Sequence, residues 1–572
     1  MKAFNVICLM LIIGFVLVLL LEKLEGRSAE TDEESGEKSS LKTKLNLIFG
    51  KEFWLLLIYG MIAIRCIGLG SIPGGFNQDG AMGAVDALAL AEHGTDRFGT
   101  HLPAHFQAWG YGQMSVLLSY LTVPLIKLWG LNTLTARLPM MVVSVLGAAA
   151  VYGIVKELIS SKAAMAALLF VAINPWHFMQ SRWALDCNVF PHMFIIGTYF
   201  LVKGLKKSYN YYLAMIFYAL CMYSYGVSFY MVPFFLLFTC IMLLVCRKIN
   251  WKQMLLCMLV YFGLAFPIYG TMLINFMKWE TVELPFVTMQ YFEGSVRSND
   301  MLFFSEEPLK QLVSNFSSLL KVVFLQKPDL IWNAIDDFGT MYQCSMPLIL
   351  IGLGITCYLS KKGKSSSEKL ISRILLIYWG CSIFTGLCIN SVNVNRINII
   401  FYSHIIFAGI AVYHLVKKWK IFAVVLLVIY ALQSLLFFNR YFTTWSDEME
   451  DIFYEDFLDA VDFAGNQECD YYYITPDTQY TGSWNVSEIL TLFALNMDAE
   501  YYQGKTDRFR GAEISYGTRY RYSNPSPEEI RTDLKIAYVI KVESLGNYDL
   551  NQFAVKYFDD YCVVMPRTYA GW

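Results

Sequence analysis

The sequence predicts an α-helical, polytopic membrane protein of about 12 transmembrane helices that ends in a small α/β domain. The chain has 572 residues, of which 56% are hydrophobic and 16% are charged. Its mean hydropathy of +0.43 is too high for an ordinary soluble domain. After Phe438 the composition becomes polar and rich in tyrosine, which indicates a separate domain. The net charge of −2 gives no sign of a nucleic-acid partner.

Twelve apolar runs are long enough to cross a bilayer, or nearly so. A hydrocarbon core of about 30 Å takes about 20 helical residues, so the shorter runs must extend into their flanks. The runs are Phe4–Leu21, Phe53–Ile72, Leu138–Val155, Ala163–Trp176, Val189–Val202, Tyr211–Tyr225, Phe229–Cys246, Met254–Phe276, Met346–Leu359, Leu370–Ile389, Ile397–Val416 and Ile421–Phe438. A further run, Met114–Trp129, is ambiguous because it contains Pro124 and Lys127.

The basic residues predict the orientation, because lysine and arginine concentrate in cytoplasmic loops. They cluster at Lys38–Lys51, Lys156–Lys162, Lys203–Lys207, Arg247–Lys252, Lys361–Arg373 and Lys417–Lys420. Two crossings must separate neighbouring clusters, and only the interval from Lys51 to Lys156 holds three candidates. We therefore expect Met114–Trp129 to lie along the outer surface as an interfacial helix. Asp79, Arg182, Asp186 and Arg396 then all lie on the outer side.

The first run, Phe4–Leu21, has two interpretations. It could be a cleaved signal peptide. Cleavage would leave the cluster Lys38–Lys51 outside, against the charge rule. A retained span with its N-terminus outside fits better, so we expect residues 1–52 to form an extra helix and a cytoplasmic linker.

We expect a transmembrane catalytic domain at 53–438, with a first external loop at 73–137 and a long one at 277–343. In the long loop, Ser305–Pro308 has the residues of a helix start, and apolar residues recur at helical spacing up to Val323. This pattern predicts an amphipathic helix on the membrane or on the catalytic face, although ordinary packing of a loop helix explains it equally well.

Residues 439–572 are expected to form an extracytoplasmic α/β domain. Apolar patterns predict helices at Phe453–Ala464 and Val486–Leu495. Strands are predicted at Asp470–Ile474, Lys535–Ile540 and Ala554–Val564. Most of the 13 cysteines lie in apolar runs, but Cys469 and Cys562 share this domain. A disulfide between them is possible, although spacing alone does not establish it.

Asp79 follows the apolar run Phe53–Ile72 at the predicted outer surface, where ionisable groups are costly and usually functional. Partial burial there would raise its pKa toward a value that suits a general base. The alternative is an N-cap for a helix over Ala81–Ala91. Asp86 lies seven residues on, hence on the same helix face, and is predicted to be a supporting hydrogen-bond partner.

Two further stations carry polar residues beside apolar runs. Arg182 and Asp186 are four residues apart, so on a helix they could form a simple ion pair. In the functional interpretation Arg182 faces an anionic group, and Asp186 or Asn188 orients it or the acceptor. Arg396 lies among four asparagines and has no positive-inside explanation, while its planar fork of donors suits phosphate. The remaining polar residues of the first loop, each individually more typical of structure than of catalysis, are His101, His105, Gln113 and Arg137.

These stations, in this order, resemble the membrane glycosyltransferases of the GT-C class, above all the protein O-mannosyltransferase and aminoarabinose transferase branch. The resemblance covers roughly Phe53–Phe438 and leaves the C-terminal domain out. Its carrying segments are Asp79 after the first core span, GTDRFGTHLPAHFQAWGYGQMSVLLSYL, LNTLTARLP, AINPWHFMQSRWALDCNVFP, YSYGVSFYMVP and NVNRINIIFYSH.

The resemblance implies that Asp79 is the catalytic base. The family often has an acidic pair there, but Gly80 takes the second place in this chain. Lipid monophosphate donors of this branch do not obviously need a metal, and we expect no metal or other cofactor. The implied reaction moves a sugar from a polyprenyl phosphate to an acceptor hydroxyl on a protein, lipid or glycan, with inversion.

The roles that follow are catalysis by Asp79 and Asp186 and support from Asp86 and Asn188. Arg182 and Arg396, with His105 or Gln113, would stabilise the phosphate leaving group. We expect a multi-pass protein of a bacterial plasma membrane, with its active site outside.

Two other classes of function remain open. A transporter or flippase would bury ionisable groups near the middle of its spans. Here the span interiors hold few such groups, with His404 the main exception. A non-catalytic scaffold for cell-envelope polysaccharide assembly can be excluded only by measured activity.

Overall fold

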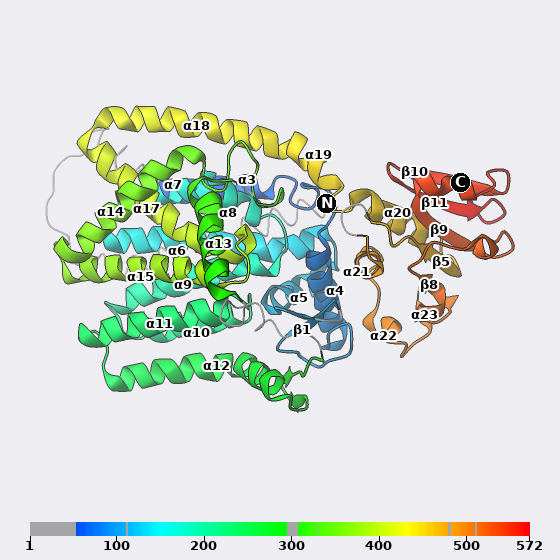
Figure 1. Cartoon of the computed structure of the whole chain (residues 1–572), viewed down its shortest axis with the longest axis horizontal. Coiled ribbons are helices and arrows are strands. Elements are labelled where there is room, and N and C mark those ends of the chain that lie inside the picture. The colour runs from blue at the N-terminus through cyan, green and yellow to red at the C-terminus, as the bar shows by residue number, and fades with distance from the viewer. Residues whose placement is uncertain (1–52, 110–111, 294–306, 328, 479–481, 510–511) are drawn as a thin grey trace, which may run out of the picture.

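The computed structural model describes residues 53–109, 112–293, 307–327, 329–478, 482–509 and 512–572. Long helices run side by side in a bundle, and the α/β domain lies beyond one end of it (Figure 1). The predicted span Phe4–Leu21 and the linker that follows lie outside the described residues.

The bundle is that of a multi-pass membrane protein. Seven described helical segments are long and apolar enough to cross a membrane. Their helices are α6 (Thr133–Leu158), α11 (Ser228–Val245), α12 (Trp251–Met277), α14 (Met346–Lys362), α15 (Ser366–Cys388), α17 (Ile400–Lys418) and α18 (Lys420–Phe442). The other predicted spans within the described residues contain α3 (Phe53–Cys66), α7 (Ser161–Ile173), α9 (Asp186–Gly204) and α10 (Asn210–Met222). The predicted membrane fold is therefore confirmed.

Small residues allow close packing inside this bundle. A Cβ atom on Gly409 of α17 would lie 2.6 Å from Cα of Ala167 in α7. A Cβ on Gly352 of α14 would overlap the carbonyl of Phe407 in α17. Because apolar lipid offers helices no hydrophobic reason to associate, such close contacts supply much of the packing energy.

The segment between α3 and α6 forms a small layer at the end of the bundle nearest the α/β domain (Figure 1). Helix α4 (Gln78–His93) runs across the direction of the long helices and packs against α5 (Leu117–Trp129). In the sequence between these two helices, β1 (Phe106–Ala108) pairs antiparallel with β2 (Gly112–Met114). Helix α5 has 13 residues. The predicted spans α7 and α10 contain helices of the same length, so the interfacial position of α5 stays a prediction.

The segment between α12 and α14 contains a hairpin of β3 (Val282–Leu284) and β4 (Val287–Met289), followed by α13 (Pro308–Leu319) and a π turn, Leu320–Phe324. The predicted start at Ser305 lies outside the described residues, and the helix itself begins at Pro308. Leu309, Val313 and Phe316 are 79%, 69% and 56% exposed. This exposed apolar face supports a position of α13 on the membrane.

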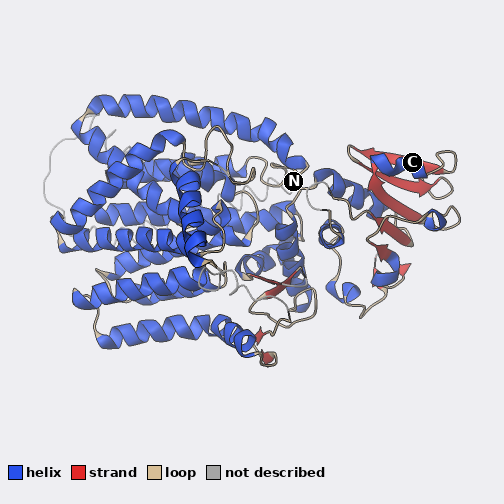
Figure 2. Cartoon of the chain, viewed as in Figure 1, coloured by secondary structure: helices blue, strands red, loops and turns tan. Residues whose placement is uncertain are grey.

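The C-terminal part has the predicted α/β structure, in a sheet of order β10-β11-β9-β5-β8 (Figure 2). Strands β9, β10 and β11 are antiparallel, whereas β5 is parallel to both of its neighbours. The elements are α19 (Thr444–Glu450), α20 (Glu455–Asn466), β5 (Tyr471–Ile474), α21 (Trp484–Ala494), α22 (Ala499–Tyr502), β6 (Arg508–Phe509), β7 (Ala512–Glu513), α23 (Tyr516–Arg519), β8 (Tyr520–Arg521), β9 (Ile536–Lys541), β10 (Phe553–Phe558) and β11 (Tyr561–Pro566). Cys469 and Cys562 are both buried and free, so they form no disulfide in this structure.

The C-terminal domain docks on α4 and the residues beside it. Helix α21 packs against α4, and the rings of Phe76 and Phe493 stack with centroids 4.5 Å apart. The Phe76 N–H donates to the Phe453 carbonyl at 2.6 Å. The Gln503 amide donates to the Arg97 carbonyl at 3.0 Å. The helix that begins beside Asp79 is therefore in contact with both the bundle and the C-terminal domain.

Candidate functional site

Asp79 lies in the first turn of α4 and is half-buried. The N-cap of this helix is Asn77, whose side chain accepts the Asp79 N–H at 3.0 Å. The alternative prediction that Asp79 itself caps the helix was therefore wrong. Its carboxylate accepts a hydrogen bond from Trp109 Nε1 at 3.1 Å. Trp109 follows β1, so the hairpin of the first loop orients this carboxylate.

Gly80 allows the closest approach between α4 and the segment that contains Arg182 and Asp186. A Cβ atom at position 80 would lie 2.5 Å from the Ala184 carbonyl oxygen and 3.2 Å from the Phe76 ring. A side chain does not fit between these groups. The structure thus explains why no second carboxylate follows Asp79.

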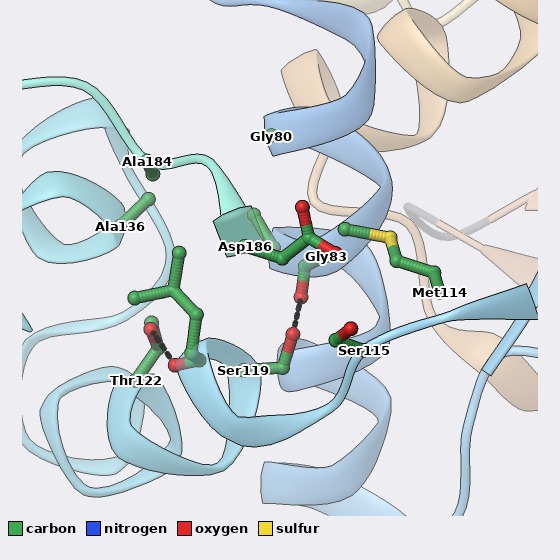
Figure 3. Close-up of a pocket in the computed structure, with 11 residues that line it drawn as sticks. Gly80, Gly83, Met114, Ser115, Ser119, Thr122, Ala136, Ala184 and Asp186 are labelled. Carbon is green, nitrogen blue, oxygen red and sulfur yellow. Dashed lines mark hydrogen bonds between the residues drawn. The ribbon is translucent and has the colours of Figure 1, made fainter. Parts of the chain in front are cut away.

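Asp186 is the first residue of α9 and borders a small pocket between α4 and α5 (Figure 3). Its carboxylate is turned toward α4 near Gly83. Ser119 Oγ donates to the Gly83 carbonyl at 2.7 Å on the same wall. The residues around the pocket are Gly80, Gly83, Ala84, Met114, Ser115, Leu118, Ser119, Thr122, Ala136, Ala184 and Asp186.

Asp86, predicted to be a supporting residue, pairs with a residue of the first loop. It is fully buried and pairs with Arg97, with Nη1 and Oδ2 2.5 Å apart. The Arg97 N–H donates to its other oxygen at 3.0 Å, and Arg97 Nη2 donates to the Gln107 carbonyl at 2.9 Å. This ion pair ties α4 to the hairpin that carries Trp109.

Arg182 is fully buried, and protein oxygens already satisfy most of its guanidinium. Nε donates to the Tyr441 hydroxyl at 3.1 Å and Nη1 to the Arg65 carbonyl at 2.6 Å. Nη2 donates to the carbonyls of Ile67 and Ile72 at 2.7 and 2.9 Å. The predicted direct role in phosphate binding does not fit this arrangement. Nor is there a helical pair with Asp186, because α9 begins only at Asp186.

Arg137, near the start of α6, acts in the same way on the segment between α3 and α4, residues 67–77, which we call the α3–α4 loop. It donates to the carbonyls of Leu69, Pro73 and Gly75 at 3.2, 3.0 and 2.8 Å. Arg137 and Arg182 together thus hold five backbone carbonyls of this loop. Irregular backbone is tolerated beside a membrane only where its polar groups find partners. The two arginines therefore position the loop that leads into Asp79.

Arg396 is used differently. It belongs to α16 (Val394–Ile397), is half-buried, and its Nη1 donates to the side chains of Asn390 and Ser391. Among the described residues, no hydrogen bond from Nε or Nη2 of Arg396 is formed. Asn398 donates to the Cys187 carbonyl at 2.9 Å, which places α16 beside the start of α9. Arg396 thus keeps donors available near Asp186.

The other predicted site residues are divided between the hairpin and α9. His105 and Gln113 are both buried, at 4% and 7% exposure, and Gln113 pairs with Gln107 across the hairpin. Asn188 is buried in the first turn of α9, and its Nδ2 has no partner among the described residues. His101 is exposed.

A buried polar network that sequence reasoning missed joins four segments of the bundle. Arg65 Nη2 donates to His177 Nδ1 at 2.9 Å. Because arginine only donates, the His177 proton sits on Nε2, which donates to the Tyr402 hydroxyl at 3.0 Å. That hydroxyl then donates to His192 Nδ1 at 2.6 Å. The network ties α8 (Pro175–Gln180), which leads into Arg182, to α3, α9 and α17.

This network corrects the expectation that His404 is the main ionisable group inside the spans. Arg65 lies within the predicted span Phe53–Ile72 and His192 within Val189–Val202, and both are fully buried. A charged residue inside an apolar run was the available signal. No such signal pointed to Trp109, whose contact with Asp79 depends on the hairpin.

Comparison with known proteins confirms the predicted resemblance. Residues 114–270 match the family described as dolichyl-phosphate-mannose-protein mannosyltransferases. This segment includes Arg182 and Asp186 but neither Asp79 nor Arg396. No curated protein sequence matches the chain significantly.

Two solved structures of ArnT from Cupriavidus metallidurans are similar over most of their length. The apo form has a TM-score of 0.55 and 13% identity and covers 91% of this chain and 99% of that one. The form bound to undecaprenyl phosphate has a TM-score of 0.55 and 12% identity and covers 91% and 100%. At this level of identity the comparison establishes the fold, which is of the GT-C class.

Proposed function

We propose that this chain, whose fold is that of GT-C glycosyltransferases, transfers a sugar from a polyprenyl phosphate to an acceptor hydroxyl. The observation that carries the proposal is the position of Asp79. Its carboxylate is half-buried, oriented by Trp109, and follows a loop that two buried arginines hold. The undecaprenyl phosphate bound in one similar structure supports a lipid phosphate as the donor.

In the proposed reaction Asp79 accepts the proton of the acceptor hydroxyl, and the hydroxyl oxygen attacks the anomeric carbon. The bond from this carbon to the phosphate oxygen breaks on the opposite face, so the configuration inverts. Asp186, across the pocket from α4, orients the acceptor. A single carboxylate at α4 suffices for proton removal, which is compatible with the glycine at position 80.

The phosphate site is proposed around Arg396, with His105 and Gln113 as further candidates. Nε and Nη2 of Arg396 form no hydrogen bond with any described residue, whereas Arg182 is a positioning residue. Arg65, Arg137 and Arg182 are buried and form no ion pair with any described carboxylate. Their uncompensated charge creates a positive potential, which favours a phosphate anion in this part of the molecule.

We further propose that the site faces the outside of a bacterial plasma membrane, with α5 lying on the surface. The domains would then be 53–438 for catalysis and 439–572 for an extracytoplasmic module.

Cysteines at His101 and Asn132, which are both exposed and flank α5, should react with an impermeant thiol reagent added outside. The background must lack the exposed Cys344 and Cys357. Labelling at only one of the two positions would contradict the topology.

The direct test uses the purified protein in nanodiscs and a panel of polyprenyl-phosphate monosaccharides. We expect polyprenyl phosphate to be released only when an acceptor hydroxyl is present. The anomeric configuration of the product, measured by NMR, should be opposite to that of the donor. Movement of labelled lipid across the bilayer without sugar transfer would favour the flippase alternative. Absence of both sugar transfer and lipid movement with every donor would favour the scaffold alternative.

A further inference from the structure

Helix α4 ends, opposite Asp79, in a group of side chains from two domains. Glu92 and His93 are close to its C-terminus, and Asp498 precedes α22 of the C-terminal domain. One ligand atom from each of the three lies within 4.8 Å of the others. His93 and Asp498 are 405 positions apart in the chain, and they meet only because the C-terminal domain docks on α4.

Asp498 is held in place for this contact. Its Oδ1 accepts the N–H groups of Glu500 and Tyr501 at 2.6 and 3.3 Å, as the N-cap of α22. Its Oδ2 therefore points to His93 Nε2, at 3.3 Å. The Glu500 carboxylate lies on the other side of the ring, 4.0 Å from Nδ1.

The separations suit one small cation. Bonds of about 2.0–2.2 Å in a tetrahedral Zn²⁺ site place neighbouring ligand atoms about 3.4 Å apart. Nε2 of His93 is 3.3 Å from the Asp498 oxygen and 3.9 Å from Glu92 Oε2. The Glu92 side chain is 44% exposed and can move by the remaining distance. The site also remains open to solvent, which a metal needs for entry.

The charges call for a cation. Three carboxylates surround one imidazole at the C-terminal, negative end of a helix. Within the described part of the chain, none of Glu92, Asp498 and Glu500 pairs with a lysine or arginine.

We propose that Glu92, His93 and Asp498 bind a divalent transition-metal cation, with Zn²⁺ as the best fit, that fastens the C-terminal domain to α4. One imidazole and two carboxylates favour such a metal over Mg²⁺, which prefers oxygen ligands and water. Nδ1–H of His93 then donates a hydrogen bond to the Glu500 carboxylate, which orients the ring, as carboxylates commonly do behind a ligating histidine. The site is at the far end of α4 from Asp79 and takes no part in sugar transfer.

The test measures Zn²⁺ binding to the chelator-treated full chain in detergent by calorimetry and elemental analysis. We expect one Zn²⁺ per chain, lost in His93→Gln and in Glu92→Gln. Glu92 is exposed, so its substitution should not affect folding. Glu500→Gln should weaken binding about 10- to 100-fold. Glu528→Gln, an exposed acid elsewhere in the same domain, should bind like the wild type.

Thermal unfolding gives an independent readout. Zn²⁺ should raise the unfolding midpoint of the wild type, because the ion binds only the docked state, and should not raise that of His93→Gln. Equal Zn²⁺ binding by the wild type, His93→Gln and Glu92→Gln would overturn the proposal. Absence of Zn²⁺ binding by the wild type would overturn it as well.

Discussion

Arg182 and Arg396 lie in neighbouring segments beside the start of α9, and their guanidinium groups are used in opposite ways. Arg182 is fully buried and donates to three backbone carbonyls and a tyrosine hydroxyl. Arg396 is half-buried, and within the described residues only its Nη1 donates, to the side chains of Asn390 and Ser391 and to the Ser391 carbonyl. The first arginine supports backbone, and the second can bind a ligand.

The comparison distinguishes two roles that an arginine can have near a membrane, where burying its charge is costly. A buried guanidinium is stable there only if its donors are satisfied, and backbone carbonyls of an irregular loop satisfy them without a carboxylate. A guanidinium that keeps donors free and remains accessible can instead exchange water for a phosphate.

The largest effect on folding is expected from Arg182→Ala. The substitution leaves the carbonyls of Arg65, Ile67 and Ile72 without their donor. Each unsatisfied buried group costs about 1–3 kcal/mol, so the three carbonyls together imply a loss of at least about 3 kcal/mol in unfolding free energy. Thermal unfolding in detergent measures it. Arg508→Ala, at an exposed ion pair, should change stability by less than about 0.5 kcal/mol.

Arg396→Ala should leave stability nearly unchanged and weaken donor use. A charge-assisted hydrogen bond to an anion contributes about 1.5–3 kcal/mol, hence a roughly 10- to 100-fold rise in KM for the donor. Arg396→Lys should lie between the wild type and alanine, because it keeps the charge and loses the fork. Arg440→Ala, at a comparably exposed arginine paired with Glu448, is the matched control. A normal donor KM in Arg396→Ala would make both arginines structural.

Gly80→Ala tests the contact between α4 and the Arg182 segment. The new methyl group meets the Ala184 carbonyl at 2.5 Å, and backbone must shift. Overpacking of this kind costs about 1–3 kcal/mol, and the shift should also lower the transfer rate. Gly83→Ala provides the control, because there the methyl group meets only the ends of the Met114 and Ser119 side chains. Equal effects of the two substitutions would contradict a special role for position 80.

The smallest effect is expected at Glu455, whose carboxylate lies over Gly74 in the loop that Arg137 holds. Burial raises its pKa to about 7, and Glu450, Asp459 and Asp456 add to the rise. The stability that depends on its protonated form is thus present at pH 4 and lost as the pH rises through 7. Glu455→Gln should match the wild type at pH 4 and exceed it by about 1 kcal/mol at pH 8, after allowance for solvent screening. Unfolding midpoints across this pH range measure it, and a pH-independent difference would exclude the linkage.

The roles of Asp79 and Asp186 stay predictions, whereas hydrophobic runs and capping residues were sufficient to predict the membrane fold and the α/β structure of the C-terminal part. They were not sufficient to assign Arg182, because which donors are free depends on the path of residues 67–77. That path has no periodic pattern. Trp109 and the pairing of Asp86 with Arg97 were missed for the same reason, since both depend on how the hairpin folds back on α4.

The transfer rate of Asp79→Asn most directly tests whether Asp79 is the catalytic base. Asparagine keeps the size of the side chain and an oxygen for Trp109, so the protein should fold and unfold like the wild type. Without a base, the initial rate of sugar transfer should fall by about 10²–10⁴-fold. Asp337→Asn, an exposed residue between α13 and α14, should keep the full rate. Transfer at the wild-type rate by a well-folded Asp79→Asn protein would contradict the assignment.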